Sequence, residues 1–247
     1  MSGFQEFGFG QNDNGIGTRA KKFKGEKGKT YRIGFAWWAG MEKDDFGPSA
    51  FEVEEGKEEN LTPKFIGAPR NYHKDAGYVI NKGPEFTQLL GENPRTMVAT
   101  LIVKWPLNSK GQLDKEALLE SMPEVMPWIF SQDKYEKLKK MHASGYWMHD
   151  HDVQIDCEDT QFQKFNFLPA KQNIFKEMLK SAKGQEVAKF VIDRVRQMAP
   201  NLGREIGQDL TLAQLKEKLG MDSGGPVGNV VATDGEMDNM LSNMLDD

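Results

Sequence analysis

The sequence predicts an α+β fold with a core that is a small β-barrel or a small antiparallel sheet. Three observations support this prediction. Stretches with period-two alternation of apolar residues occupy the first two thirds of the chain, long polar excursions separate them, and the last third places apolar residues at helical spacing. About five short β segments followed by helices are typical of a small barrel or sheet with appended helices.

Length and composition fit a folded protein of one domain with appendages, or of two small domains. The chain has 247 residues, and no apolar run approaches the roughly 20 residues that cross a bilayer. The N-terminus lacks the pattern of a signal peptide. Cys157 is the single cysteine, which excludes an intramolecular disulfide and agrees with a reducing compartment. We therefore expect a cytoplasmic protein with no membrane association.

The net charge of −5 is unevenly distributed along the chain. Residues 221–247 contain six acids and no Lys or Arg, so the remainder holds 32 bases against 31 acids. Within it, residues 19–40 carry seven bases and one acid, whereas residues 41–60 carry eight acids and two bases. The local field around residues 19–40 is therefore positive, and an anionic ligand is compatible with the acidic total.

The first strand is predicted to begin at Thr30. Residues 1–17, rich in Gly, Asn and Gln, form a disordered arm. From Thr30, alternation places two sets on opposite faces, with Arg32, Ala36 and Trp38 opposite Tyr31, Ile33, Phe35 and Trp37. We expect the face with Arg32 and Trp38 to be solvated and cationic.

Further strands are predicted on either side of residue 90. Residues 41–63 form an acidic excursion, and residues 64–80 form short strands broken by Gly and Pro. Residues 96–105, "TMVATLIVKW", are apolar on both faces until Lys104 and should lie at the centre of a sheet. Period two returns in residues 149–169, where Val153, Ile155 and Cys157 face one way.

Helices are predicted between these strands and in the C-terminal third. An insertion begins where Asp114 caps a first turn, is broken by Pro123 and Pro127, and ends with a helix that stops at Gly145 and has an apolar stripe of Tyr135, Leu138 and Met141. Two further apolar stripes follow, comprising Ile174, Phe175, Met178 and Leu179, then Val187, Phe190, Val191, Val195 and Met198. Thr211 caps a short last helix ended by Gly220. An OB-like barrel accommodates such insertions and is the candidate architecture for residues 18–220.

Basic and aromatic residues together predict a surface for single-stranded nucleic acid. Phosphates need cations along a groove, and unpaired bases need flat side chains on which to stack. We expect Trp38 to stack on bases and Trp105 to belong to the core, although some aromatic members can equally be core residues. The predicted set is Lys21, Lys22, Lys24, Lys27, Lys29, Arg32, Trp38, Arg70, Tyr72, Lys74, Tyr78, Lys104, Trp105, Phe162 and Lys164.

The stretch "WMHDHDVQIDCED" has two interpretations. Its two histidines and its carboxylates at positions 150, 152, 156 and 158 could hold a divalent cation in a metal-dependent nuclease. Alternation along a strand, however, places His149 and His151 opposite Asp150 and Asp152. We favour a solvated strand edge, with no metal site and no cofactor. No phosphate-cradling loop or nucleophile motif is present in the sequence, so nothing predicts an enzyme.

The C-terminal segment, residues 221–247, is predicted to be a flexible acidic tail that binds a partner. Its apolar residues have the spacing of one helical stripe, too short to be stable alone, and a Gly-rich linker precedes them. The alternative is a disordered solubilising tail. The stripe consists of Met237, Met240, Leu241, Met244 and Leu245.

The order of these parts resembles the single-stranded DNA-binding (helix-destabilising) proteins of tailed bacteriophages. The similarity lies in a mobile arm, strand-like pieces such as "KTYRIGFAWW" and "TMVATLIVKWP", and an acidic C-terminus. It implies an OB-fold core and a tail that recruits replication, recombination or RNA polymerase proteins in the bacterial host cytoplasm, with self-association possible. The chain departs from relatives that carry a Cys/His zinc site, and it ends "NMLDD" without a terminal aromatic residue. A metal-dependent nuclease and a virion or scaffold protein are the alternatives.

Overall fold

The computed structural model describes residues 21–38, 62–120, 122–160 and 164–221. The predicted arm, most of the acidic excursion, Phe162 and the tail stripe from Met237 to Leu245 lie outside the described residues. The chain divides into two compact units, Met1–Asp209 and Leu210–Asp247. The sheet and all but one of the described helices belong to the first unit.

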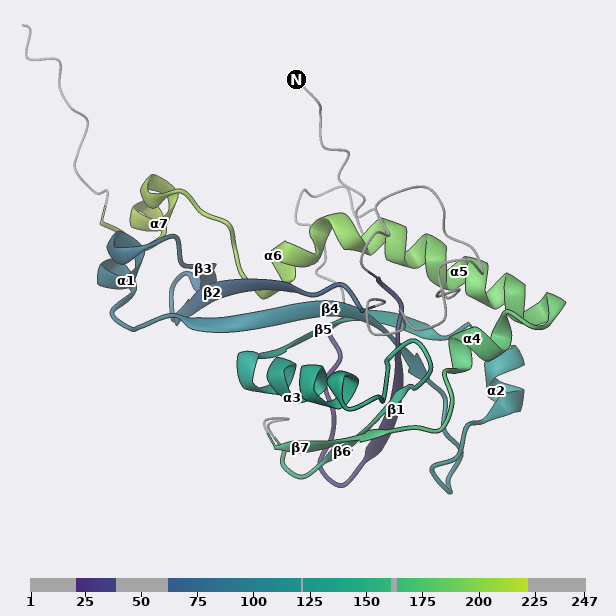
Figure 1. Ribbon diagram of the computed structural model, residues 1–247. Helices are drawn as coiled ribbons and strands as arrows, with labels where there is room; N and C mark the ends of the chain where they lie inside the picture. Colours follow the sequence, from purple (N-terminus) through teal and green to yellow (C-terminus); the bar gives the residue numbers. More distant parts are fainter. Residues whose placement is uncertain (1–20, 39–61, 121, 161–163, 222–247) are drawn as a thin grey trace, which may run out of the picture. The chain divides into compact units, whose positions relative to one another are not determined.

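The described strands form one seven-stranded antiparallel sheet that is not closed into a barrel (Figure 1). The predicted α+β class is confirmed. The sheet runs in the order β3-β2-β4-β1-β6-β7, and β5 pairs with the other edge of β4. The strands are β1 (Thr30–Phe35), β2 (Ile66–His73), β3 (Gly77–Ile80), β4 (Arg95–Trp105), β5 (Glu124–Ser131), β6 (Val153–Cys157) and β7 (Phe165–Pro169).

Strand β4 is central, as its apolar sequence predicts. Its first half pairs with β2, its second half pairs with β1 on the same edge, and β5 follows nearly its whole length on the other edge. Residues 98–103 are all buried because the sheet is covered on both faces. This long strand therefore fixes the positions of three others.

The predicted helical insertion contains a strand, β5, which was not predicted from the sequence. Pro123 and Pro127 were expected to interrupt helices, but Pro127 lies within β5 opposite Leu101. Proline lacks the N–H that a central strand must donate, so it is tolerated where one edge of a strand is outside the ladder. On that outer edge, the Pro127 carbonyl accepts a hydrogen bond from the Phe23 N–H at 2.8 Å. Similarly, Pro69 lies inside β2 and does not break it.

The helices largely follow the predicted pattern. Asp114 accepts a hydrogen bond from the Ala117 N–H and so caps α2, and Thr211 forms a capping box at the start of α7. The first unit contains α1 (Pro84–Leu90), α2 (Lys115–Glu120), α3 (Gln132–Ala143), α4 (Ile174–Met178), α5 (Ala182–Met198), the 3₁₀ turn η3 (Ala199–Asn201) and α6 (Leu202–Ile206), and the second unit contains α7 (Leu212–Lys218). No described helix is long and apolar enough to span a bilayer.

Helices cover both faces of the sheet in the first unit (Figure 1). Helices α5 and α6 lie across one face, and α3 lies against the other. The buried faces of α5 present Val187, Val191 and Val195 to the core, as the predicted stripe requires. Because β4 lies between these layers, both of its faces are removed from water.

Aromatic side chains join β5 to β7, which share no backbone pairing among the described strands. The Trp128 ring on β5 lies 6.1 Å from the Phe165 ring and 5.8 Å from the Phe167 ring on β7. Phe23, from the segment before β1, contacts Trp128 edge-on at 5.8 Å. These ring contacts pack β7 against β5 although the two strands share no ladder.

Candidate nucleic-acid interface

Two exposed tyrosines stand side by side on the β2–β3 hairpin. Tyr72 and Tyr78 are directly paired in register, so their side chains project from the same face. Their ring centroids are 5.1 Å apart and their planes are tilted by 58°. Tyr72 is 58% exposed and Tyr78 is 41% exposed, so neither is a core residue. The hairpin thus presents two flat aromatic surfaces to solvent.

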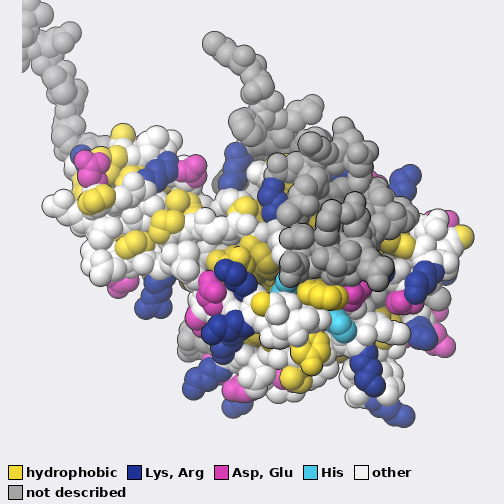
Figure 2. All heavy atoms as spheres, in the orientation of Figure 1, with side chains coloured by type: hydrophobic (Ala, Val, Ile, Leu, Met, Phe, Trp, Pro, Cys, Tyr) yellow, Lys and Arg dark blue, Asp and Glu magenta, His cyan; other side chains and the backbone are white. Residues whose placement is uncertain are grey.

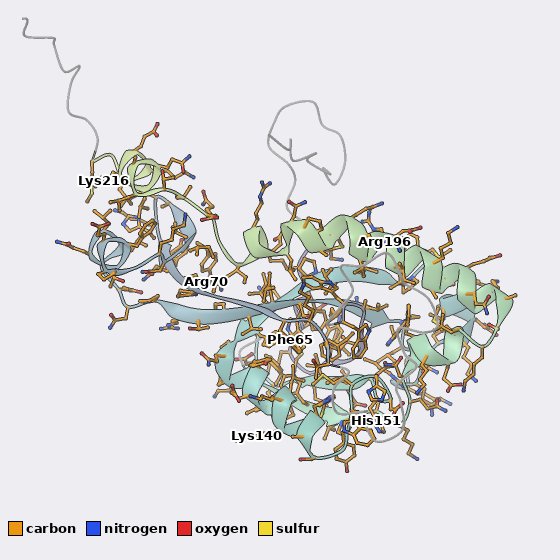
Figure 3. The ribbon with its side chains drawn as sticks, turned by 45° about the horizontal axis from the view of Figure 1, so that its top comes forward. Phe65, Arg70, Lys140, His151, Arg196 and Lys216 are labelled. Atoms are coloured by element: carbon orange, nitrogen blue, oxygen red, sulfur yellow. The ribbon has the colours of Figure 1, made fainter. Side chains whose placement is uncertain are left out.

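A guanidinium group is fixed next to this pair. Arg70 precedes Tyr72 by two residues and therefore shares its face of β2. Its guanidinium carbon lies 4.0 Å from the centroid of the Tyr78 ring, and its Nη1 donates to the Ile206 carbonyl at 2.8 Å. Burial lowers the pKa of Arg70, but arginine stays protonated at neutral pH. Figure 3 shows Arg70 on the hairpin side of the sheet, away from Lys140 and His151.

A buried amide network holds the hairpin from its opposite face. Asn71 lies between Arg70 and Tyr72 in sequence and points the other way, where it is buried. Its Oδ1 accepts from Asn81 Nδ2 at 2.8 Å, and its Nδ2 donates to the Glu92 carbonyl at 2.6 Å. Asn81 Nδ2 also reaches Thr87 Oγ1 on α1. These bonds tie β2, β3 and α1 together and limit how far the tyrosine pair can move.

Two further cations lie near the tyrosines. Arg95, at the start of β4, is the direct cross-strand partner of Arg70 and is exposed. Sequence reasoning missed Arg95, because only the strand register brings it beside Arg70. Lys74 is exposed in the hairpin turn. One acid in the same turn, Asp75, lies 3.7 Å from the His73 ring nitrogen.

Comparisons with protein-family models, with curated proteins and with solved structures found no match to this chain.

Trp38 was predicted to stack on bases, but its side chain is buried. Trp38 is 1% exposed and forms an isolated antiparallel bridge with Pro63. The extended chain continues past β1 here, so both of its faces are covered and alternation does not place Trp38 in water. Trp105 is also buried, which confirms its prediction as a core residue.

The expectation of a solvated cationic face around Arg32 is wrong. Arg32 Nε donates to Asp152 Oδ2 at 3.0 Å, and its Nη2 donates to the Gln172 carbonyl at 2.8 Å. Asp152 is fully buried and also accepts from the Ile174 N–H. Residues far along the chain therefore cover this face of β1 and neutralise its charge.

The same contacts correct the interpretation of Asp152 as part of a solvated strand edge. Burial raises the pKa of Asp152 to about 7, although the Arg32 charge, the Ile174 N–H and the Trp105 side chain each lower it. Its carboxylate is occupied by these donors. Nearby, Asp150 pairs with Lys176 at 2.6 Å. Among the described residues, no cluster of three or more His, Cys, Asp or Glu side chains has the arrangement of a metal site.

The lysines of residues 21–29 form a separate cluster. Three of them are in ion pairs, Lys21 with Glu124, Lys22 with Glu205, and Lys29 with Glu26. Lys104 shares Glu124 with Lys21. Lys24, Lys27 and Lys164 are exposed, and they form no ion pair with the part of the chain that the structure describes.

The predicted basic-aromatic set is therefore divided between two ends of β4. Arg70 lies opposite Arg95, whereas Arg32 lies opposite Trp105. Ten residues of β-strand separate these positions, a distance of about 33 Å. Exposed rings and a cation occur together at the first end, the β2–β3 hairpin. That end can stack unpaired bases and attract their phosphates.

Proposed function

We propose that this protein binds single-stranded DNA with little sequence preference. The observation that carries the proposal is the exposed Tyr72–Tyr78 pair with Arg70 held against it. Every base has a flat face, so stacking on tyrosine is tolerant of sequence. Duplex DNA buries those faces between base pairs, so the same rings favour single strands.

The energetics of the hairpin agree with this role. Stacking of a base on an aromatic side chain contributes about 1–3 kcal/mol. In the free protein, part of each tyrosine ring is in contact with water, so stacking on a base removes apolar surface from water. The hydrogen bond between Asn71 and Asn81 already fixes the backbone that carries the rings. Little conformational entropy is then lost on binding.

The connectivity of the sheet supports the predicted OB-like relationship. Without the β2–β3 hairpin, five strands remain, and β1 pairs with both β4 and β6. An OB fold is a partly open five-stranded barrel in which the loop between its first two strands contributes to oligonucleotide binding. The hairpin lies in the connection between β1 and β4, the first two of these five strands.

We further propose a role in phage DNA replication, recombination or transcription control. This part rests on the sequence resemblance alone. It assigns recruitment of partner proteins to the acidic segment of residues 221–247.

Fluorescence anisotropy with a labelled oligothymidine, compared with a duplex of equal length, tests the function. We expect binding to the single strand that weakens steeply with salt, with or without magnesium. Tyr72→Ala should weaken binding by about 1–3 kcal/mol.

Tyr146→Ala is the matched control, because Tyr146 is 47% exposed but lies outside the hairpin. Equal affinity of the Tyr72→Ala variant and wild type would refute the hairpin site. Magnesium-dependent loss of the oligonucleotide would instead favour the nuclease alternative.

A further inference from the structure

A cavity lies between α3 and the edge strand β7. Its volume is about 320 Å³. Its lining includes Lys137 and Met141 on α3, Tyr146 just after the end of that helix, and Phe165, Phe167 and Pro169 on β7. A cavity of this volume can hold one aromatic or long aliphatic side chain. It is too small for an α-helix, which is about 10–12 Å across with its side chains.

Strand β7 has an edge that natural proteins usually protect. Among the described strands, β7 pairs with β6 alone. Its sequence, Phe-Asn-Phe-Leu-Pro, contains no charged residue. Sheet edges are commonly protected by charged side chains, by proline or by a covering segment, and here Pro169 protects only the end. An edge of this kind can accept another strand.

The positive charge of α3, beside the edge of β7, favours an acidic ligand. Helix α3 carries four lysines and two acids, and both acids lie in its first half. Lys134 lies over the Phe165 ring, with its Nζ 4.7 Å from the centroid. Figure 2 shows Lys and Arg side chains near α3, with Asp and Glu side chains among them. Two acids lie on the β7 side: Glu158 accepts a hydrogen bond from Asn166 Nδ2, and Asp156 is the cross-strand partner of Asn166.

We propose that the α3–β7 cavity and the edge of β7 bind an extended acidic segment of a partner protein. The segment adds to β7 by backbone hydrogen bonds, one large apolar side chain enters the cavity, and flanking carboxylates face Lys137 and its neighbours on α3. This binding is separate from the proposed DNA site, because the hairpin residues take no part in the cavity.

A second copy of this chain fits the same edge poorly. Two copies of β7 paired edge to edge would bring the lysines of both α3 helices toward one another, and like charges in proximity oppose association. An acidic partner removes that repulsion. Its charge, and not only its apolar anchor, should therefore determine affinity.

The experiment uses the full chain and a fluorescein-labelled peptide of sequence DDVFVDD. Anisotropy should detect saturable binding below about 1 mM peptide. The peptide KKVFVKK tests charge, and DDVSVDD tests the apolar anchor. Both should bind at least about fivefold more weakly, since exposed ion pairs and buried apolar groups each contribute on the order of 1 kcal/mol.

Lys137→Glu should weaken DDVFVDD binding by about three- to tenfold. Lys139→Glu makes the same charge change on the same helix at a residue outside the cavity lining, and it should have a smaller effect. Hydrogen exchange should show new protection of the Phe165 and Phe167 amides, which face away from β6, when peptide is bound. The proposal is overturned by absence of peptide binding, by equal effects of the two variants, or by oligothymidine displacing the peptide in a Lys137-dependent manner.

Discussion

Arg32 and Asp152 form a buried ion pair that joins β1 to the segment before β6. The Arg32 Nε to Asp152 Oδ2 distance is 3.0 Å, and the carboxylate is completely buried. Removing one partner of a buried pair leaves the other without compensation. The pair therefore belongs to the stability of the fold, and its charge is not available to a ligand.

The first prediction concerns pH. The pKa of Asp152 is raised from its usual 3.8 to about 7 in the folded protein. An acid with a raised folded pKa contributes stability that is fully present below the unfolded pKa and is lost as pH rises through the folded pKa. We expect this contribution to the free energy of unfolding to fall between about pH 4 and pH 7.

Asp152→Asn keeps an acceptor oxygen for Arg32 and for the Ile174 N–H but removes the titration. Urea unfolding at several pH values should show that the difference in unfolding free energy between wild type and variant changes across this window. A difference that is constant with pH would contradict the assignment of the raised pKa.

The second prediction is that Gly34→Ala destabilises the protein. A methyl group at this position would lie 2.9 Å from Trp105 Nε1 and 3.1 Å from Asp152 Oδ1. Both neighbours are buried and fixed, so overpacking should lower the unfolding free energy by about 1–3 kcal/mol. Gly28→Ala is an unsuitable control because Gly28 has a φ of 74°. Gly203→Ala, where the added methyl meets open space within α6, should leave the thermal midpoint unchanged or raise it, because alanine is favoured over glycine in a helix.

The third prediction reverses an expectation from the sequence. Because Trp38 is buried, Trp38→Ala should lower the unfolding free energy by about 3–5 kcal/mol. Where the variant remains folded, DNA affinity should be close to that of wild type. Chemical denaturation followed by oligonucleotide binding at low denaturant distinguishes the two effects. Loss of affinity without loss of stability would restore Trp38 as a stacking residue.

The fourth prediction separates the lysines of residues 21–29. If the cluster contacts DNA, Lys24→Ala and Lys27→Ala should each reduce the slope of log K against log salt by up to about 0.7. Lys22→Ala should instead lower the thermal midpoint, because Lys22 Nζ bonds the Glu205 carbonyl at 2.6 Å and its carboxylate at 3.2 Å. An unchanged slope in both the Lys24 and Lys27 variants would restrict the DNA site to the hairpin.

The sequence by itself determined the elements with strong local signals. The apolar run of β4, the alternation in β6, the helical stripes of α3 and α5 and the caps at Asp114 and Thr211 are properties of neighbouring residues, and the structure confirms them. The sequence also indicated Tyr72 and Tyr78 as binding candidates but left open whether either is a core residue, and only the register of β2 against β3 brings the two rings together.

Tertiary structure decided which faces are buried. Period two divides the residues of β1 between two faces but does not say which face meets water, and Asp152, 120 residues away, covers the face with Arg32. Strand β5 forms despite Pro127 because its outer edge needs no ladder N–H there. Arg95 joins the hairpin site only through the register of β4 against β2. Each outcome depends on contacts between distant parts of the chain, whose free energies exceed local preferences.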